Sequence, residues 1–175
     1  MVNLSLKNIK FEYVTPDDAE FILKLRLDDR LNRFLSKVDG KLSSQRKWIE
    51  EYKKREKEQK EHYFLIKNLK TGEKLGTIRV YNIKENECTW GSWIINSNNP
   101  LYAIESILLI YKFIFEILNK EVVKFDVRKD NKTVVMFHKS YGAKLIDEDE
   151  LNYYFLYRKE DYPKLKEKFK KFIKT

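Results

Sequence analysis

Glu87-Cys-Thr-Trp-Gly-Ser-Trp-Ile-Ile95, followed by Asn96-Ser-Asn-Asn-Pro100 and an apolar run from Leu101 to Leu118, is the stretch that decides the fold of this chain. Its first part ends in β-branched and aromatic residues, its middle part consists of residues that break secondary structure, and its last part has apolar residues at helical spacing. We therefore predict a strand, a tight loop and a helix. The N-terminus of such a helix presents unpaired backbone N–H groups and a positive dipole end, which suits a phosphate.

Length and composition fit one domain, residues 1–175. The chain has 175 residues, of which 42% are hydrophobic, enough to fill a core. We find no basic leader followed by an apolar stretch, and charged residues interrupt the run from Leu101 to Leu118 before it reaches the roughly 20 apolar residues that span a bilayer. We expect a soluble cytoplasmic protein without a membrane partner. The single Cys88 agrees with a reducing compartment and gives no support to a metal site.

The formal net charge of +9 raises a nucleic-acid hypothesis. The lysines are spread along the chain and are densest at 53–60 and 164–171, both of which have the pattern of mixed or amphipathic helical faces. An ordinary solvated surface is the favoured interpretation, and attraction of an anionic partner is the other. That partner could be a phosphate-bearing cofactor or a nucleotide sugar. Nucleic-acid binding ranks last because aromatic and basic residues do not interleave in a recognisable platform.

The remaining patterns predict an alternating series of strands and helices. Strands are expected at 4–14, 62–67, 75–81, 122–127, 145–147 and 153–157, and helices at 17–30, from 43 onward, from 130 or 131 to 142, and at 161–174. With the central strand and helix, the order is βααβββαβαββ plus an appended C-terminal helix. This order predicts an α+β fold with α/β/α layers, in which a mixed, mostly antiparallel sheet carries helices on both faces.

The chain resembles the GCN5-related N-acetyltransferases (GNAT), in particular the ribosomal-protein and nucleotide-sugar acetyltransferase branch. The resemblance covers almost the whole chain in the expected order, and it rests on Trp-Gly-Ser-Trp-Ile-Ile95, Ala103-Ile-Glu105, Phe115-Glu-Ile-Leu118, Asn131 and His138-Lys-Ser-Tyr-Gly142-Ala. It implies the GNAT acyl-CoA N-acyltransferase fold. It also implies an enzyme that transfers an acetyl group from acetyl-CoA, as co-substrate, to a primary amine.

The resemblance also implies how acetyl-CoA is held. The strand before the loop splays from its neighbour, and its backbone pairs with the amide arm of the cofactor; the alternative is a plain buried strand. The implied cofactor-binding residues are Trp93, Ile94 and Ile95 on the strand, Leu101, Tyr102, Ala103 and Ile104 at the helix N-terminus, and Asn131 and His138 beside the pantetheine arm. The phosphate loop departs from the family, because Asn98 to Ala103 lacks the arginine and the first glycine and Pro100 has no N–H to donate.

Two residues are candidates for catalysis. By resemblance His138 occupies the place of a tyrosine that protonates the leaving thiolate, and an imidazole with an ordinary pKa near 6.5 suits that role. The alternative is a half-buried helix residue bonded to a backbone carbonyl. Glu87 is a candidate general base on the central strand, although a solvated charge at the end of a hairpin is at least as good an interpretation, and a relayed water could serve instead. For Glu105 we expect a structural role in the first turn of the helix.

Acceptor binding is assigned to Arg30, Phe34, Tyr81 and Trp90. Arg30, with Arg26 and Arg33, could meet the phosphates of a nucleotide sugar, and salt bridges to Asp28 and Asp29 are the alternative. Trp48 and Trp93 are further aromatic candidates. Because Trp90 and Trp93 differ by an odd number, they should point to opposite faces of the strand unless a bulge at Gly91 intervenes.

The leading hypothesis is therefore an acetyl-CoA-dependent N-acetyltransferase acting on a small-molecule amine by direct attack, with an amino sugar on a nucleotide as the preferred acceptor. One alternative is a non-catalytic binding module on the same fold with a degenerate loop. Another is an acetyltransferase of protein N-termini or side chains. The sequence does not determine the oligomeric state, and a homodimer stays open.

Overall fold

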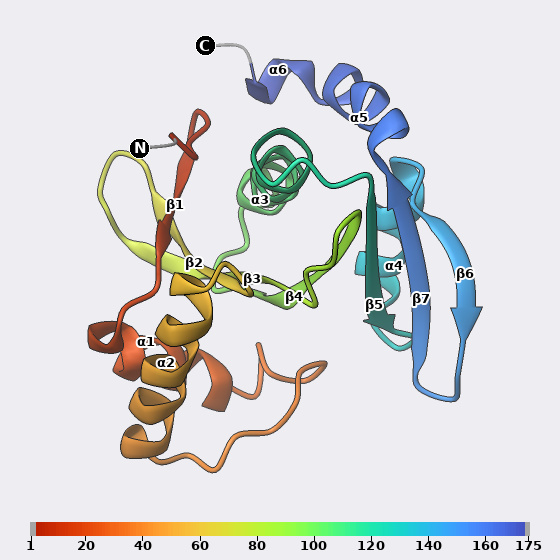
Figure 1. The fold of residues 1–175 in the computed structure, drawn as a ribbon. Coiled ribbons are helices and arrows are strands. Elements are labelled where there is room, and N and C mark those ends of the chain that lie inside the picture. The colour runs from red at the N-terminus through yellow and green to blue at the C-terminus, as the bar shows by residue number, and fades with distance from the viewer. Residues whose placement is uncertain (1–2, 174–175) are drawn as a thin grey trace.

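The computed structural model describes residues 3–173, and within them seven strands form one mixed sheet in the order β1-β2-β3-β4-β5-β7-β6 (Figure 1). The strands are β1 (Ile9–Tyr13), β2 (His62–Asn68), β3 (Lys74–Tyr81), β4 (Glu87–Ile95), β5 (Val122–Arg128), β6 (Lys144–Glu148) and β7 (Asn152–Arg158). Neighbouring strands pair antiparallel except β4 and β5, which are parallel. The predicted mixed, mostly antiparallel sheet is confirmed.

Helices cover both faces of the sheet, as predicted (Figure 1). The α-helices are α1 (Ala19–Leu27), α2 (Leu42–Lys57), α3 (Pro100–Lys112), α4 (Lys132–Ser140), α5 (Tyr162–Lys168) and α6 (Lys170–Ile173), and the shorter turns are η1 (Pro16–Asp18), η2 (Phe113–Ile117) and η3 (Lys159–Asp161). Helices α1 and α2 lie on one face, and α3 lies on the other with α5 beyond it. No helix within residues 3–173 is long and apolar enough to cross a membrane.

The core has two parts, one on each side of the sheet. The larger part joins the sheet to α3, α4 and α5, and the smaller part joins it to α1 and α2 through Ile22, Ile49 and Tyr52. Every residue of α3 from Glu105 to Tyr111 is buried, and Ile107, Leu109 and Ile110 are fully buried. This pattern is typical of a helix enclosed by protein.

Two predicted helix limits were wrong. The first helix ends at Leu27 rather than near residue 30, because Asp28 takes an extended conformation and its carboxylate accepts the backbone N–H of Arg30 at 3.0 Å. The C-terminal helix, predicted as one element, is divided into α5 and α6 where Phe169 leaves the helical conformation. Its predicted end at residue 174 lies outside the described residues.

Candidate active site

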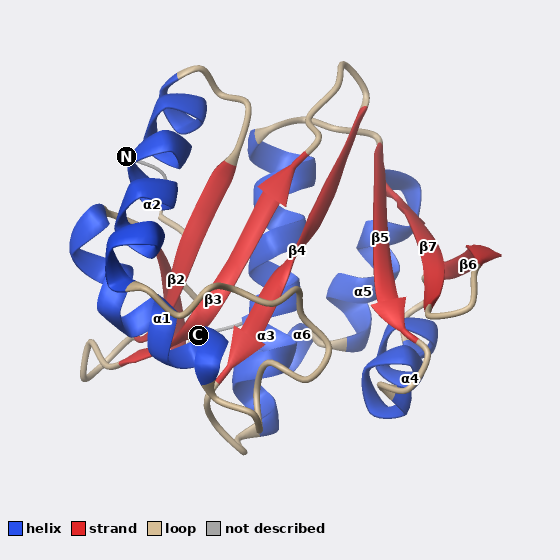
Figure 2. Cartoon of the chain, turned by 90° about the horizontal axis from the view of Figure 1, so that it is seen from below, coloured by secondary structure: helices blue, strands red, loops and turns tan. Residues whose placement is uncertain are grey.

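The sheet opens at its middle, between β4 and β5. These strands pair only at Glu87↔Val122, Cys88↔Val123 and Thr89↔Lys124, and beyond Thr89 they diverge (Figure 2). Within residues 3–173, the β5-facing backbone edge of β4 after Thr89 has no strand partner. An extended ligand with amide groups can bond to such an edge. Trp93, Ile94 and Ile95, the predicted cofactor-binding residues of the strand, lie on this part of β4.

A bulge reshapes β4 just beyond this point. The register with β3 changes between Arg79↔Gly91 and Thr77↔Ile94, and Ser92 has a φ of +50°. The bulge brings Trp90 and Trp93 together, with ring centroids 5.7 Å apart. Residues an odd number apart point to opposite faces of a regular strand, and a bulge near Gly91 is the exception under which these two rings can share a face. Trp90 is buried beneath α3 and is not among the residues that line the acceptor-side cavity described below, so the structure does not place it as the predicted acceptor wall.

His138 on α4 lies where the two strands separate. Its ring centroid is 5.4 Å from that of Trp90 and 4.7 Å from that of Phe125, the first residues beyond the last strand pair. Nδ1 lies 2.6 Å from the Tyr141 hydroxyl, so its partner is a side chain and not the backbone carbonyl of the alternative interpretation. Nε2 is buried and has no hydrogen-bond partner within the described residues, and the same holds for Nε1 of Trp93. Two unpaired polar nitrogens at one place suggest that a ligand atom completes the site.

Burial sets the protonation state of His138. The side chain is fully buried, and desolvation lowers its pKa from the ordinary value to about 3. The imidazole is therefore neutral at pH 7. The expectation that its pKa would lie near the ordinary 6.5 was wrong, because the side chain is buried. A neutral imidazole can still donate its single N–H to a developing negative charge.

The N-terminus of α3 is capped from within the chain. The Asn99 side chain accepts the N–H of Leu101 at 3.0 Å, and the Asn99 carbonyl accepts the N–H of Tyr102 at 3.2 Å. Pro100 has no N–H. A phosphate that binds here must displace the Asn99 side chain, so the departure seen in the sequence has a structural counterpart. Ala103 and Ile104 follow in the first turns and are half-buried.

Two further residues, Asn131 at the start of α4 and Glu105 on α3, have clear positions. Asn131 immediately precedes α4, is half-buried, and makes no side-chain cap bond in that position. Glu105 is fully buried, and its Oε1 accepts the backbone N–H of Asn8 at 3.0 Å. Desolvation raises the pKa of this carboxyl. Glu105 thus ties α3 to the segment before β1. The predicted place in the first turn was wrong, because α3 begins at Pro100 and has no acidic residue in its first turn.

A cavity of about 390 Å³ lies on the other face of the sheet, between α1, α2 and the strands. Its lining includes Arg26, Ser36, Gln45, Trp48, Arg79 and Ser92. Arg26 is held by hydrogen bonds from Nη2 to the carbonyl and hydroxyl of Ser36, at 2.8 and 2.9 Å. Burial, with a smaller effect of nearby Arg79, lowers the pKa of Arg26. Two guanidinium groups beside one cavity suit the oxygens of a phosphate or a carboxylate.

None of the four predicted acceptor residues is among the residues that line this cavity. Tyr81 lies beside the cavity, because the guanidinium of Arg79 stands 4.4 Å from its ring centroid. Arg30 is exposed and ion-paired with Asp28 at 2.6 Å, which is the salt bridge of the alternative interpretation. Phe34 is half-buried in the loop before α2, and within the described residues neither it nor Arg30 lines the cavity.

Sequence reasoning missed Arg79, although a signal was present. Arg79 and Tyr81 stand two positions apart on β3, so they share a face of the sheet. The alternation that gives Tyr81 its face of the sheet gives Arg79 the same face. Gln45 and Ser92 had no comparable signal, because their position depends on how α2 packs and on the bulge.

Two carboxylates are candidates for a general base. Glu87 lies in the paired part of β4, where its side chain forms an ion pair with Lys124 at 3.0 Å. Asp126 lies on β5 directly after Phe125, on the opposite face of the strand from that ring. Desolvation raises the pKa of Asp126. Burial, and after it the charge of Asp126, raises the pKa of Tyr81. Asp126 is exposed and lies beyond the last pair of β4 and β5, so it is closer to the strand opening than Glu87, which lies within the paired part.

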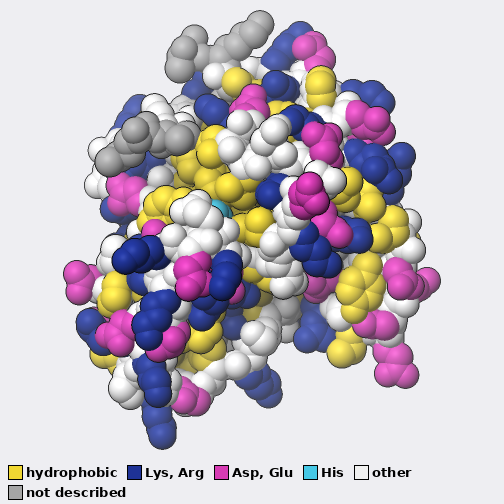
Figure 3. Space-filling view, viewed as in Figure 1, with side chains coloured by type: hydrophobic (Ala, Val, Ile, Leu, Met, Phe, Trp, Pro, Cys, Tyr) yellow, Lys and Arg dark blue, Asp and Glu magenta, His cyan; other side chains and the backbone are white. Residues whose placement is uncertain are grey.

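The charged residues visible on one face of the molecule do not form a basic patch. Figure 3 shows Lys and Arg side chains interspersed with Asp and Glu over that face. Within residues 3–173, no group of His, Cys, Asp and Glu side chains is arranged to hold a metal ion.

Comparisons with known proteins identify the family. A model of the acetyltransferase (GNAT) domain matches residues 8–144. The structure of apo FdhC, a nucleotide-linked sugar GNAT, is similar with a TM-score of 0.91 and 38% identity, covering 99% of this chain and 99% of that chain. No curated protein sequence matches the chain.

More distant structures share the fold. The ribosomal-protein-S5-alanine acetyltransferase of Vibrio fischeri has a TM-score of 0.79 at 12% identity, covering 93% of this chain and 99% of that chain. The Campylobacter jejuni N-acetyltransferase PseH in complex with acetyl coenzyme A has a TM-score of 0.66 at 21% identity, covering 86% and 99%. Since the family model covers most of the chain and FdhC is similar over nearly its whole length, the chain belongs to the GNAT family of acetyltransferases.

Proposed function

We propose that this protein transfers an acetyl group from acetyl-CoA to the amino group of a sugar that is linked to a nucleotide. The observation that carries the proposal is the bulge of β4, where two sites on opposite faces of the sheet meet. Ser92 lines the arginine-containing cavity, and the next residue, Trp93, has its ring 6.0 Å from that of His138. A ligand between the strands and a ligand in the cavity would therefore approach each other at this point.

The cofactor is assigned to the strand opening. The unpaired edge of β4 supports the amide arm of acetyl-CoA, and the N-terminus of α3 supports the pyrophosphate once the Asn99 side chain moves aside. The related fold of PseH, whose structure contains acetyl coenzyme A, supports the same choice. The neutral Nε2 of His138 and the Nε1–H of Trp93 would then find their missing partners in the thioester.

The reaction requires one proton to leave the amine and one to reach sulfur. The lone pair of a neutral amine attacks the thioester carbonyl carbon, a C–N bond forms, and the C–S bond breaks with its electron pair moving to sulfur. Asp126, directly or through a water, takes the amine proton. His138 stabilises the thiolate by donating a hydrogen bond from Nε2 and stays neutral, and the thiolate takes up a proton from solvent.

The acceptor is assigned from the chemistry of the cavity. Arg26 and Arg79 provide two guanidinium groups for phosphate oxygens, and the rings of Trp48 and Tyr81 flank Arg79 at 5.3 and 4.4 Å from its guanidinium carbon. A nucleotide sugar carries both phosphates and flat apolar surface. The similarity to FdhC, a nucleotide-linked sugar GNAT, supports this class of acceptor.

The test is release of CoA thiol from acetyl-CoA in the presence of three amine classes. We expect turnover with nucleotide-linked amino sugars, and much less with the free amino sugars or with a peptide bearing an N-terminal alanine. Turnover with the peptide alone would contradict a nucleotide-linked amino sugar as acceptor and would favour a protein acetyltransferase.

A second candidate, a non-catalytic binding module, is favoured by one observation: the backbone donors of Leu101 and Tyr102 are already satisfied within the loop. A binding isotherm for acetyl-CoA separates the two candidates. We expect binding by the wild type and its loss in Ala103→Trp, since the bulky ring would fill the first turns of α3. Absence of binding in both proteins would support the non-catalytic module.

A further inference from the structure

Four buried side chains form a hydrogen-bonded chain that ends on His138. Nε1–H of Trp90 donates to the Tyr111 hydroxyl at 3.4 Å, the hydroxyls of Tyr111 and Tyr141 are 2.9 Å apart, and the Tyr141 hydroxyl lies 2.6 Å from Nδ1 of His138. The members come from β4, α3 and the end of α4, and none is more than 5% exposed. Solvent therefore does not compete for these bonds.

The hydrogen-bonded chain has one favourable direction of proton donation. An indole N–H can only donate, so the oxygen of Tyr111 is the acceptor of the first bond. Within residues 3–173 the remaining partner of that hydroxyl is Tyr141, so the proton of Tyr111 points to Tyr141. Tyr141 then directs its own proton to Nδ1 of His138. Burial raises the pKa of both tyrosines, so both hydroxyls keep their protons.

The reverse direction leaves more polar groups unpaired. If Nδ1 of His138 carried the proton, Tyr141 would accept from it and donate to Tyr111, which would still accept from Trp90. Two buried groups would then lack partners among the described residues: the hydroxyl proton of Tyr111 and the lone pair of Nε2 of His138. In the forward direction only Nε2–H of His138 lacks a partner. The forward direction is therefore favoured by about tenfold or more, since each buried polar group left unpaired carries a desolvation penalty.

We propose that Trp90, Tyr111 and Tyr141 are positioning residues that hold His138 in the tautomer with its proton on Nε2. The donor-only indole sets the direction of the chain, and the two hydroxyls transmit it. The neutral imidazole then presents its one N–H at the opening between β4 and β5. The consequence for catalysis rests on the proposed function, because a thiolate forming there would be the missing acceptor.

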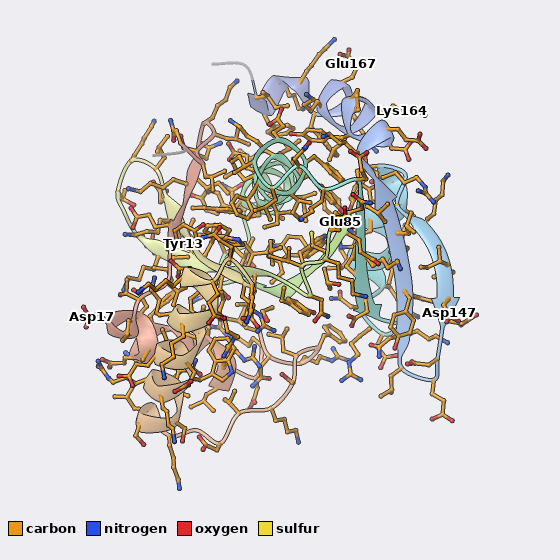
Figure 4. The ribbon with its side chains drawn as sticks, viewed as in Figure 1. Tyr13, Asp17, Glu85, Asp147, Lys164 and Glu167 are labelled. Carbon is orange, nitrogen blue, oxygen red and sulfur yellow. The ribbon has the colours of Figure 1, made fainter. Side chains whose placement is uncertain are left out.

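The tautomer can be measured without any ligand. The protein contains two histidines. A two-bond proton–nitrogen correlation spectrum of protein with ¹⁵N-labelled histidine therefore shows two ring systems. We expect the ring of His138 to show a protonated Nε2 and an unprotonated Nδ1 at pH 7. The other ring belongs to His62, whose Nδ1 lies 2.9 Å from the hydroxyl of Tyr13, on the half of the sheet away from β5 (Figure 4). A Tyr13→Phe variant assigns it.

Variants of the hydrogen-bonded residues test the direction of proton donation. In Tyr111→Phe and in Trp90→Phe, the two directions leave equal numbers of buried donors and acceptors unpaired, so the two tautomers of His138 become comparable in population and kcat falls about twofold. Tyr157→Phe is the matched control. Its ring packs 4.9 Å from Tyr111 between centroids, but its hydroxyl donates to the carbonyl of Asp161, outside the chain. We expect this variant to keep the wild-type tautomer.

Two results would overturn the proposal: a wild-type His138 protonated on Nδ1, or an unchanged tautomer in a folded Tyr111→Phe protein. The spectrum is independent of turnover. If the wild type held the Nε2–H tautomer yet transferred no acetyl group to any amine, the positioning chain would stand and the proposed function would fail.

Discussion

The hydroxyl oxygen of Tyr81 lies over the backbone of Gly91, 2.9 Å from the position that a Cβ at Gly91 would occupy. The absence of a side chain at Gly91 lets the Tyr81 ring rest on β4, beside the guanidinium of Arg79. Gly91 lies in sequence between Trp90, which packs on His138, and Ser92, which lines the cavity, so this contact lies between the two sites.

Gly91→Ala therefore tests the position of Tyr81. The added methyl group pushes the Tyr81 hydroxyl away, and we expect the KM for the acceptor to rise about tenfold while the KM for acetyl-CoA stays the same. Steady-state kinetics with each substrate varied in turn measures both. Adding Tyr81→Phe removes the clashing oxygen and should recover part of the loss. An unchanged acceptor KM in Gly91→Ala would show that this contact does not shape the cavity.

Arg79→Gln tests the anionic group of the acceptor. Loss of a charge-assisted hydrogen bond to a phosphate should raise the acceptor KM by about 10- to 100-fold. The matched control is Arg46→Gln, which removes an exposed charge from α2 and should change nothing. Equal effects of the two variants would indicate general electrostatic attraction rather than a contact in the cavity.

Asp126→Asn and Glu87→Gln separate the two candidate bases. If Asp126 accepts the amine proton, its replacement removes the acidic limb of the kcat/KM–pH profile and lowers kcat. Glu87→Gln should keep the limb, since it breaks only a partly exposed ion pair with Lys124 that is worth at most about 1 kcal/mol. The opposite pattern would return Glu87 to the role that the sequence suggested.

Asn99→Ala tests the capped N-terminus of α3. Loss of the side-chain bond to the Leu101 N–H should lower the free energy of unfolding by about 1 kcal/mol without ligand. At saturating CoA the difference should shrink, because a bound phosphate supplies the same N–H with an acceptor. Thermal unfolding with and without CoA measures this. A loss of stability that CoA leaves unchanged would place the pyrophosphate elsewhere.

His138→Phe tests the buried neutral imidazole. The folded-state pKa of about 3 lies below the unfolded value, so only the unfolded chain takes up a proton as the pH falls below about 6.5, and stability falls with it. Replacement by Phe should reduce this slope by up to about 1.4 kcal/mol per pH unit between about pH 6 and 4.5. His62, with its pKa lowered to about 4, keeps its own share. Urea unfolding at several pH values gives the slopes, and identical slopes would contradict a buried neutral His138.

The order of the elements could be predicted because each leaves a local pattern. The helix α4 is the clearest case: Asn131 stands at its N-cap position, and Gly142, with a φ of +104°, follows its end. The strand–loop–helix around β4 was equally readable from hydrophobic spacing. These features depend on residues that are close together in the sequence.

The candidate site could be predicted only in part, because it depends on contacts between distant segments. The left-handed Ser92 gives no sign of itself in the sequence, yet it decides that Trp90 and Trp93 share a face. Tyr111 and Tyr141 are 30 positions apart and meet only when α3 and α4 pack on one side of the sheet. The departure of the loop at Pro100 was visible, but the internal cap by Asn99 was not.

The short seam between β4 and β5 divides the sheet into two half-sheets joined by three residue pairs. Arg79 and Ser92 belong to one half, and Asp126 belongs to the other, together with the β5 strand on which His138 packs. A cofactor that bonds to the free edge of β4 would lie between the two half-sheets and fill the gap that opens beyond Thr89. The cofactor would then be the one component in contact with both halves, and the acceptor cavity, which is already formed on one half, would meet the reacting carbon across that gap.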